Sequence, residues 1–374
     1  MAFALSVIHE RGAGERRVSA TPATVLRLAR IGANVTIESG CGTAATFQDT
    51  AYQGVAVESD RHSLLRDADV VLAVQPPDVA TVQAMKPGSL LLSFIHGASS
   101  PDLVRALRDG RITCCAMEQI PRISRAQTMD ALSSQAALAG YHAVLLGAVH
   151  MPRILPMMTT AAGSLRAAKV LVMGLGVAGL QALATAHRLG AITEGYDVRP
   201  ETREQAQSLG AKFVDTGIDA RGSGGYAREL TPEEKASVAE TVSRHIAEAD
   251  LIVTAASVPG RPAPKLVSAA QIAGMKPGSV IVDVGAESGG NCEGTEPGTT
   301  VIKGAVTLLG PVNLPSMVAQ HASELYAKNL VNLLEVIVKD GTVQLDFSDE
   351  VIAGVVLTHD GQIRNPTVLA SIGA

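Results

Sequence analysis

The chain has 374 residues, of which 47% are hydrophobic and 18% charged, and its formal net charge is −5 at pH 7. This composition excludes a disordered chain, and dispersed charges of negative sum give no electrostatic reason to expect nucleic acid as a partner. Aromatic residues make up only 3%, whereas small residues that let helices lie close to a parallel sheet are abundant. The length and composition predict an α/β protein of two domains.

The chain opens on a strand, Phe3 to Ile8, without the basic and apolar regions of a signal peptide. No uninterrupted apolar run reaches the ~20 residues that span a bilayer, so we expect no direct membrane insertion. The four cysteines form no CxxC pair, and Cys114 and Cys115 adjoin in an apolar run that is typical of buried thiols. This cysteine usage indicates a reducing compartment, and we expect a cytoplasmic protein.

Strand-like runs alternate with helical stretches along most of the chain, which is the pattern of βαβ units. A weak internal repeat divides them into two halves. An aspartate opens an apolar strand at Asp69 and again at Asp250, and a Lys-Pro-Gly turn precedes the next strand at Lys86 and at Lys276. Pro-Gly is a common turn, so convergence is one explanation. The shared order of the two features favours duplication.

Polar residues gather in the segment Pro121 to Gln135, which holds two arginines, two glutamines, an aspartate and three serines between apolar stretches. No single helical or strand period places all of these groups on a solvated face. The segment directly precedes the part of the chain with a nucleotide-binding pattern. We therefore expect it to line a ligand site.

An apolar helix over residues 136–149 joins the two halves, and Pro152 ends it. A second helical pattern, over 316–338, returns the chain to the first half, where 343–347 and 355–358 are expected to form further strands. The expected domains are 1–132 with 316–374, a Rossmann-like domain, and 133–315, an NAD-binding Rossmann domain. The fold class is α/β, with two doubly wound, mainly parallel sheets linked by long helices around a cleft.

A dinucleotide-binding pattern lies in the second half. The apolar strand Lys169 to Met173 runs into Gly174-Leu175-Gly176-Val177-Ala178-Gly179, and a helix follows from about Leu180 to Leu189. Gly174 permits a tight turn, Gly176 lets the backbone approach a pyrophosphate, and Gly179 lets the helix pack on the strand. Free N–H groups at the helix start then attract the phosphates.

An acidic residue ends the next strand, in Tyr196-Asp197-Val198-Arg199. A carboxylate there accepts hydrogen bonds from the ribose hydroxyls and repels a 2′-phosphate, so Asp197 favours NAD over NADP. Arg199 is a complication, because an arginine accommodates that phosphate. A second irregularity is the polar sequence Thr193-Glu194-Gly195 within the strand that leads to Asp197.

A glycine-rich connection follows at 221–228, with Gly225 and Tyr226 near its tip. Such density of glycine in a long connection indicates either a lid over the nucleotide or a flexible loop with a stray aromatic residue. Composition alone leaves these two interpretations equally good.

Several strings occur together and in one order over nearly the whole chain. They are 15–18, Pro121 to Asp130, Gly140-Tyr141, Gly174 to Gln181, Asp197 to Arg199, Gly225 to Ala227, Pro259 to Pro264 and Gly289 to Cys292. In that order they resemble the NAD(H)-binding component, a soluble portion of the alpha subunit, of proton-translocating NAD(P) transhydrogenase. The run from Pro121 to Asp130 is highly specific, whereas many dehydrogenases share the glycine motif.

The resemblance implies an oxidoreductase and translocase that works with partners. This component would hold NAD(H), a second would hold NADP(H), and a membrane-spanning component would couple hydride transfer to proton movement. It also implies a homodimer that associates peripherally with the inner membrane through its partners. The residues that would contact the dihydronicotinamide are Arg122, Gln127, Asp130 and Ser133; those that would bind the rest of the coenzyme are Gly174, Gly176, Val177, Ala178, Gly179, Asp197, Val198, Arg199, Gly225, Tyr226 and Ser257.

The residues missing from the sequence fit this activity. Hydride transfer between two nicotinamides needs two rings held face to face, without a general acid or base acting on a substrate carbonyl. The sequence has no HExxH motif, and its histidines are scattered, so we expect no metal site.

Two alternatives remain. The same fold and NAD domain belong to alanine dehydrogenase, whose chemistry needs a substrate-binding lysine and a proton-handling histidine. His96 stands where that family keeps its histidine, but the stretch Val71 to Pro76 contains no lysine, with Ala73 where the resemblance places it. His9 likewise replaces an expected basic residue. The other alternative is a non-catalytic NAD-binding module, which would have no use for Arg122, Gln127 and Asp130.

Overall fold

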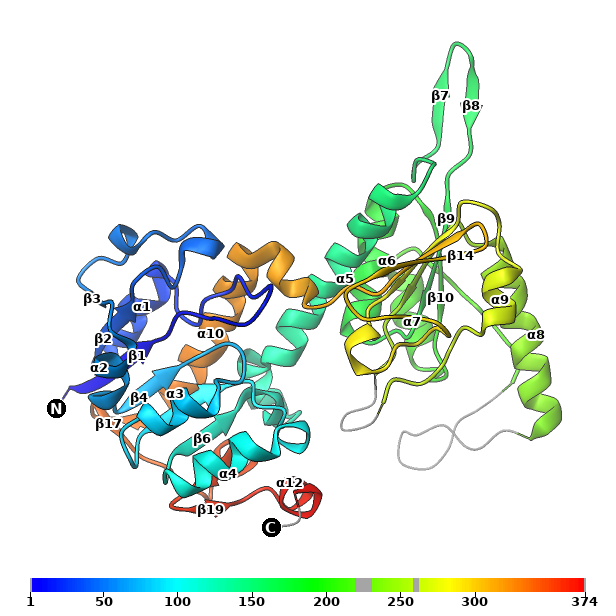
Figure 1. Ribbon diagram of the computed structural model, residues 1–374. Coiled ribbons are helices and arrows are strands. Elements are labelled where there is room, and N and C mark those ends of the chain that lie inside the picture. Colours follow the sequence, from blue (N-terminus) through cyan, green and yellow to red (C-terminus); the bar gives the residue numbers. More distant parts are fainter. Residues whose placement is uncertain (1, 219–230, 258–261, 373–374) are drawn as a thin grey trace. The chain divides into compact units, whose positions relative to one another are not determined.

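A computed structural model describes residues 2–218, 231–257 and 262–372. The chain divides into two compact units (Figure 1). Unit 1 consists of Met1–Gln135 and Ser316–Ala374, and unit 2 of Ala136–Pro315. Each unit is a mainly parallel sheet with helices packed against it, so the chain is an α/β protein, as its composition predicts.

The sheet of unit 1 has the strand order β3-β2-β1-β4-β5-β6, all parallel, and β18 and β19 extend it antiparallel beyond β6. Its strands are β1 (Phe3–Val7), β2 (Ala33–Glu38), β3 (Ala56–Glu58), β4 (Val70–Leu72), β5 (Leu90–Ser93), β6 (Thr113–Ala116), β18 (Val356–His359) and β19 (Gln362–Ile363). Its helices are α1 (Pro22–Arg30), α2 (Arg61–Arg66), α3 (Val79–Ala84), α4 (Pro101–Asp109), α10 (Ala319–Ile337), α11 (Glu350–Val355) and α12 (Pro366–Ser371).

The sheet of unit 2 repeats this topology with the order β11-β10-β9-β12-β13-β15, all parallel, and antiparallel β14 at its edge. This is the strand order of dinucleotide-binding folds. Its strands are β9 (Lys169–Met173), β10 (Ile192–Tyr196), β11 (Lys212–Phe213), β12 (Leu251–Thr254), β13 (Val280–Asp283), β14 (Thr300–Lys303) and β15 (Val306–Leu309). Its helices are α6 (Val177–Arg188), α7 (Thr202–Ser208), α8 (Pro232–Glu248) and α9 (Ala269–Ala273).

The internal repeat marks the same contact in both units. The Asp69 carboxylate accepts a backbone N–H of β1 at 2.9 Å and pairs with Lys86 at 2.6 Å. In unit 2 the Asp250 carboxylate accepts the first N–H of β9 at 2.8 Å and pairs with Lys276 at 3.2 Å. Each aspartate thus joins the first strand of its unit to the turn before the fifth. A shared strand order and a shared contact favour duplication over convergence.

Parallel strands buried on both faces explain the apolar runs of unit 2. In β9, Val170 and Val172 pack into the core on one face, and Leu171 and Met173 pack on the other.

The polar residue Glu194 within β10 has a partner on a neighbouring helix. Its carboxylate lies 2.7 Å from Nδ1 of His245 on α8, and its side chain is only 12% exposed. A hydrogen-bonded partner offsets the cost of removing a polar group from water. This contact therefore explains how a glutamate stands within a strand that leads to Asp197.

Helix α5 (Ala131–His150) begins five residues before the predicted start. Asp130 is the reason, because its carboxylate accepts the backbone N–H of Ser133 at 2.9 Å and so caps the first turn. The polar segment therefore ends inside a helix. Among the described residues, α5 is the one helix long and apolar enough to cross a membrane by length and composition, with 33% of its most apolar window buried. Its residues Ala131 and Ala143 belong to hydrophobic cores, as in a helix of a globular fold.

The expected strand over 343–347 is wrong. Only β17 (Thr342–Val343) forms, and it pairs with β16 (Val338–Lys339) in a separate short hairpin. The Asp346 carboxylate accepts the N–H and hydroxyl of Ser348 at 2.9 and 2.6 Å, and this local turn replaces extended backbone. All four cysteines are buried free thiols, as predicted for Cys114 and Cys115.

Candidate dinucleotide-binding site

Three glycines shape the turn between β9 and α6, and each meets a different constraint. Gly174 has φ +91°, and a Cβ there would lie 2.7 Å from the backbone nitrogen of Ala256. A Cβ on Gly179 would lie 1.9 Å from the carbonyl oxygen of Gly174. A Cβ on Gly176 would meet nothing within 4 Å. Packing therefore explains two of the glycines and leaves the third without a structural reason to be glycine.

The N-terminus of α6 faces this turn. The helix begins at Val177, three residues before the predicted start, with Gly176 as its N-cap and no capping side chain among the described residues. The first N–H groups of a helix have no partner within it. Together with the positive end of the helix dipole, they suit an anionic group such as a pyrophosphate.

Helix α5 packs directly on the same turn. A Cβ on Gly140 would lie 2.0 Å from the carbonyl oxygen of Ala178, so only glycine allows this approach. The signal in the sequence is a glycine within an otherwise apolar helix, which usually marks a close packing contact. Gly140 contributes to the family resemblance, but sequence reasoning assigned it no packing role.

Asp197 follows β10 at the same sheet edge, and its side chain is only 6% exposed. Its carboxylate accepts the N–H of Leu175 at 2.7 Å, the N–H of Arg199 at 2.8 Å, and both Nε and Nη2 of Arg199 at 3.0 Å. Burial opposes ionisation, but the Arg199 guanidinium and these backbone donors outweigh it and hold the pKa of Asp197 below its usual value. The carboxylate is thus charged and fixed beside the glycine turn, while Val198 is exposed.

A buried amide holds the segment after β12 against this turn. Oδ1 of Asn291 accepts the N–H of Ala256 at 3.1 Å, and its Nδ2 donates to the carbonyl oxygens of Ala256 and Pro264 at 2.9 and 2.8 Å. Ser257, one residue further, is exposed. Asn291 is fully buried, so these bonds replace water for both of its polar atoms.

Asp283 ends β13 in the same network and is also fully buried. Its carboxylate accepts hydrogen bonds from the hydroxyls of Thr254 and Thr295 at 3.0 and 2.6 Å, and from the N–H groups of Gly285 and Cys292 at 3.1 and 2.9 Å. Four donors offset the cost of burying the charge. Sequence reasoning missed Asn291 and Asp283 as supports of this edge, because neither carries a motif.

The polar segment of unit 1 brings together two of its four predicted residues. The Asp130 carboxylate contacts the N–H and hydroxyl of Ser133 at 2.9 and 2.5 Å. Arg122 and Gln127 are exposed. Gly225 and Tyr226 lie outside the described residues, so the structure says nothing of the predicted closing loop.

Sequence models of the N-terminal and C-terminal domains of the alanine dehydrogenase/PNT family match residues 6–139 and 143–366. A relative from Rhodospirillum rubrum, which is a separate portion of NAD(P) transhydrogenase subunit alpha, is 44% identical over 97% of this chain and 98% of its own length. The chain belongs to the NAD(P) transhydrogenase alpha-subunit family. The solved structure of transhydrogenase from Sinorhizobium meliloti agrees, with a TM-score of 0.86 and 39% identity over 97% of this chain and 99% of that one.

The alanine dehydrogenase branch of the family is a more distant match. A solved L-alanine dehydrogenase covers 99% of both chains with a TM-score of 0.80 at 25% identity. Its fold is therefore the same, and the difference must lie in side chains. In this transhydrogenase-family chain the strand ends of unit 1 carry glutamates and glutamines.

Those side chains bind one another. Glu15 and Arg17 form an ion pair at 2.6 Å with side chains 1% and 3% exposed, and Gln75 and Gln135 bond to its two members at 2.9 and 2.8 Å. Glu10 accepts the backbone N–H groups of residues 74 and 75, and its burial raises its pKa to about 7. Protein carboxylates thus occupy the strand ends of unit 1, where the corresponding edge of unit 2 has a glycine turn.

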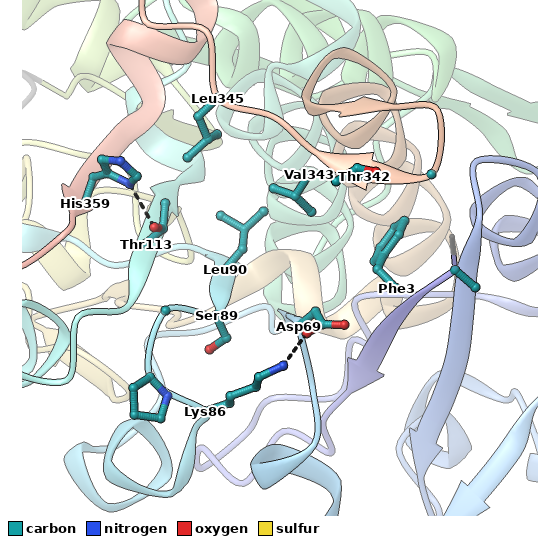
Figure 2. Close-up of a pocket in the computed structure, with 14 residues that line it drawn as sticks. Phe3, Asp69, Lys86, Ser89, Leu90, Thr113, Thr342, Val343, Leu345 and His359 are labelled. Atoms are coloured by element: carbon teal, nitrogen blue, oxygen red, sulfur yellow. Dashed lines mark hydrogen bonds and ion pairs between the residues drawn. The ribbon is translucent and has the colours of Figure 1, made fainter.

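A cavity of about 570 Å³ lies at the opposite edge of the unit 1 sheet (Figure 2). It is lined by the starts of β1, β5 and β6 and by the Asp69–Lys86 pair, with His359 on β18 at its rim. Ligands of such folds bind at the carboxyl ends of the strands. Among the described residues, no group of three or more histidine, cysteine, aspartate or glutamate side chains could hold a metal ion.

Proposed function

We propose that this chain is the NAD(H)-binding component of a proton-translocating transhydrogenase. It would hold NADH for direct hydride transfer to NADP+ on a partner component, and a membrane-spanning component would couple that transfer to proton translocation. The observation that carries the proposal is Gly176, whose open space at a bare helix N-terminus fits a pyrophosphate and has no packing explanation.

The binding roles follow from the positions of the residues. We assign the coenzyme to the domain 133–315, with the pyrophosphate on the N–H groups of the turn from Gly174 to Gly179 and the adenosine ribose on Asp197. Val198, Arg199 and Ser257 would border it, and Gly225 and Tyr226 would close over it. The ionised state of Asp197 supports a preference for NAD(H), because a second negative charge at the ribose would be repelled.

The chain's own groups would position the reacting ring without taking part in bond making. The coenzyme supplies the hydride when bound. Arg122 and Gln127, exposed donors on unit 1, would hydrogen-bond the carboxamide and ribose, and Asp130 with Ser133 would fix the start of α5 beside them. No buried base is needed for this reaction. The chain would lie on the cytoplasmic side of the membrane, attached through its partners.

Replacing Arg122 tests this function. For Arg122→Ala we expect hydride transfer to partner-bound NADP+ to fall about 100-fold, because a loosely held ring rarely reaches near-contact distance. The NADH dissociation constant should change by less than about threefold, since most contacts lie elsewhere on the coenzyme. Rates would be measured with the NADP-binding partner and affinities by calorimetry.

Arg66→Ala is the matched control, since Arg66 is an exposed arginine of unit 1 whose ion pair is with its neighbour Asp67. Unchanged transfer by Arg122→Ala would contradict the assignment of the segment. Steady NADH production from alanine and NAD+ by the wild type would instead favour the alanine dehydrogenase alternative. An NAD-binding module without catalysis would show no transfer with any partner.

We also propose a homodimer, supported by the hairpin β7 (Met158–Thr160) and β8 (Gly163–Leu165) of unit 2. The hairpin projects away from its unit (Figure 1). Met157 and Leu165 at its base are 70% and 54% exposed. A two-stranded hairpin alone is marginally stable in water, so it needs a surface to pack on.

Sedimentation of Leu165→Asp tests the dimer. A charge at a buried interface position costs several kcal/mol, so we expect a monomer where the wild type is a dimer. Leu26→Asp, at a leucine of α1 that is 55% exposed, is the control and should leave the mass unchanged. A wild type that sediments as a monomer would reject the proposal.

A further inference from the structure

The segment that carries Arg122 and Gln127 is held by residues from the far end of the chain. Here it is called the Arg122 loop and comprises Pro121 to Met129, including the 3-10 helix Ser124–Met129. Ala126 and Met129 are buried in the unit 1 core. Side chains of α10 and of the residue that caps α11 make polar contacts with the loop from outside.

Arg125 and Asp349 form the first contact. Both guanidinium nitrogens Nη1 and Nη2 of Arg125 bond to the two carboxylate oxygens of Asp349, at 2.8 and 2.6 Å. The same carboxylate accepts the N–H of Val351 at 2.8 Å and so caps α11. A bidentate pair of this kind fixes direction as well as distance. Asp349 therefore holds both the loop and the start of a helix.

Two asparagines of α10 form the second contact. Nδ2 of Asn329 and Nδ2 of Asn332 both donate to the carbonyl oxygen of Thr128, at 2.9 and 2.8 Å. Oδ1 of Asn329 in turn accepts the hydroxyl of Ser134 in the first turn of α5, at 2.8 Å. Asn329 is 6% exposed, and a carbonyl with two amide donors has both lone pairs satisfied.

We propose that Asp349, Asn329 and Asn332 are positioning residues for hydride transfer, which act by fixing the Arg122 loop. They bond to Arg125 and Thr128 and leave the side chains of Arg122 and Gln127 exposed for the ring. The effect on transfer rests on the proposed function; the effect on the loop does not. This role gives a reason why the chain returns to unit 1 after Pro315.

The first test is proteolysis by trypsin, which needs no partner and no coenzyme. In Asp349→Asn every trypsin site is retained, whereas the charge that holds Arg125 is lost. Cleavage of the Arg122–Ile123 bond, followed by mass spectrometry, should become about fivefold faster, because opening of the loop precedes cleavage. Asn still accepts the N–H of Val351, so α11 should remain capped.

Asp360→Asn is the matched control. It makes the same change in another ion pair of unit 1, between Arg111 and Asp360 at 2.9 Å. It should cleave at the wild-type rate. Equal cleavage of the Arg122–Ile123 bond in Asp349→Asn and wild type would overturn the proposal, and so would a general acceleration at every trypsin site, which marks global destabilisation.

The second test is kinetic. With the NADP-binding partner, Asp349→Asn and Asn332→Ala should each lower the rate of hydride transfer about tenfold, while the NADH dissociation constant stays within about twofold. A looser loop with unchanged transfer would overturn the positioning role. A wild type that transfers no hydride would reject the proposed function, and proteolysis would still decide whether these residues fix the loop.

Discussion

Replacing Gly176 with alanine is expected to abolish most NADH binding and leave the fold intact. Its φ of −79° suits alanine, and the added Cβ meets no protein atom within 4 Å. The loss of a favourable N-cap is offset by the lower entropy of the unfolded chain, so the free energy of unfolding should change by less than about 1 kcal/mol. The methyl group would instead occupy the space of the pyrophosphate. Calorimetry should show NADH affinity lowered about 100-fold, as expected for overpacking a tight contact.

Gly179→Ala is the contrasting variant. Its Cβ would lie 1.9 Å from a backbone oxygen, so the helix must move away from β9. We expect the free energy of unfolding to fall by about 3 kcal/mol or more, measured by denaturant titration. Two neighbouring glycines would thus separate a binding role from a packing role. If Gly176→Ala bound NADH as tightly as wild type, the turn would not hold the coenzyme.

The sheets could be predicted from sequence because their strands are buried on both faces and read as apolar runs. β9 begins and ends at the predicted residues, and the repeated aspartates at Asp69 and Asp250 mark corresponding strands. Where side chains compete with the backbone, prediction failed. Asp130 started α5 early, and Asp346 replaced a strand by a turn.

The candidate site was predictable only where a motif has a fixed local geometry. The glycine turn and Asp197 belong to one βαβ unit, so their spacing is set by the fold. Gly140, Asn291 and the contact of Arg125 with Asp349 depend on partners far away in the chain. No local periodicity reports such contacts, because each is decided by tertiary packing.

The two units also show how one topology came to serve two purposes. Both have the same strand order, but Glu10 and Glu15 bind backbone N–H groups at the strand ends of unit 1. A carboxylate that satisfies those donors leaves none for a phosphate and repels it. This arrangement supports binding of one NADH per chain, at unit 2.

Replacing Asp197 is the second large effect, and it concerns coenzyme choice. In Asp197→Ala, Arg199 loses the carboxylate that now holds its guanidinium at 3.0 Å and becomes free to bind a 2′-phosphate. The ribose hydroxyls lose a charged acceptor, worth about 1.5–3 kcal/mol. We therefore expect NADH affinity to fall about 10- to 100-fold and NADPH affinity to rise, so that the wild-type preference for NADH narrows. Calorimetry with both coenzymes measures this.

Asp197→Asn separates charge from structure, since Asn keeps an oxygen for the N–H of Leu175, which the alanine variant leaves unpaired. It should retain the wild-type stability while losing much of the discrimination against NADPH, because repulsion of the phosphate depends on charge. Arg199→Ala is the reciprocal variant and should weaken NADPH further with little effect on NADH. Equal affinities of the wild type for the two coenzymes would show that Asp197 does not contact the ribose, and would return the aspartate to a role in holding Leu175 and Arg199 alone.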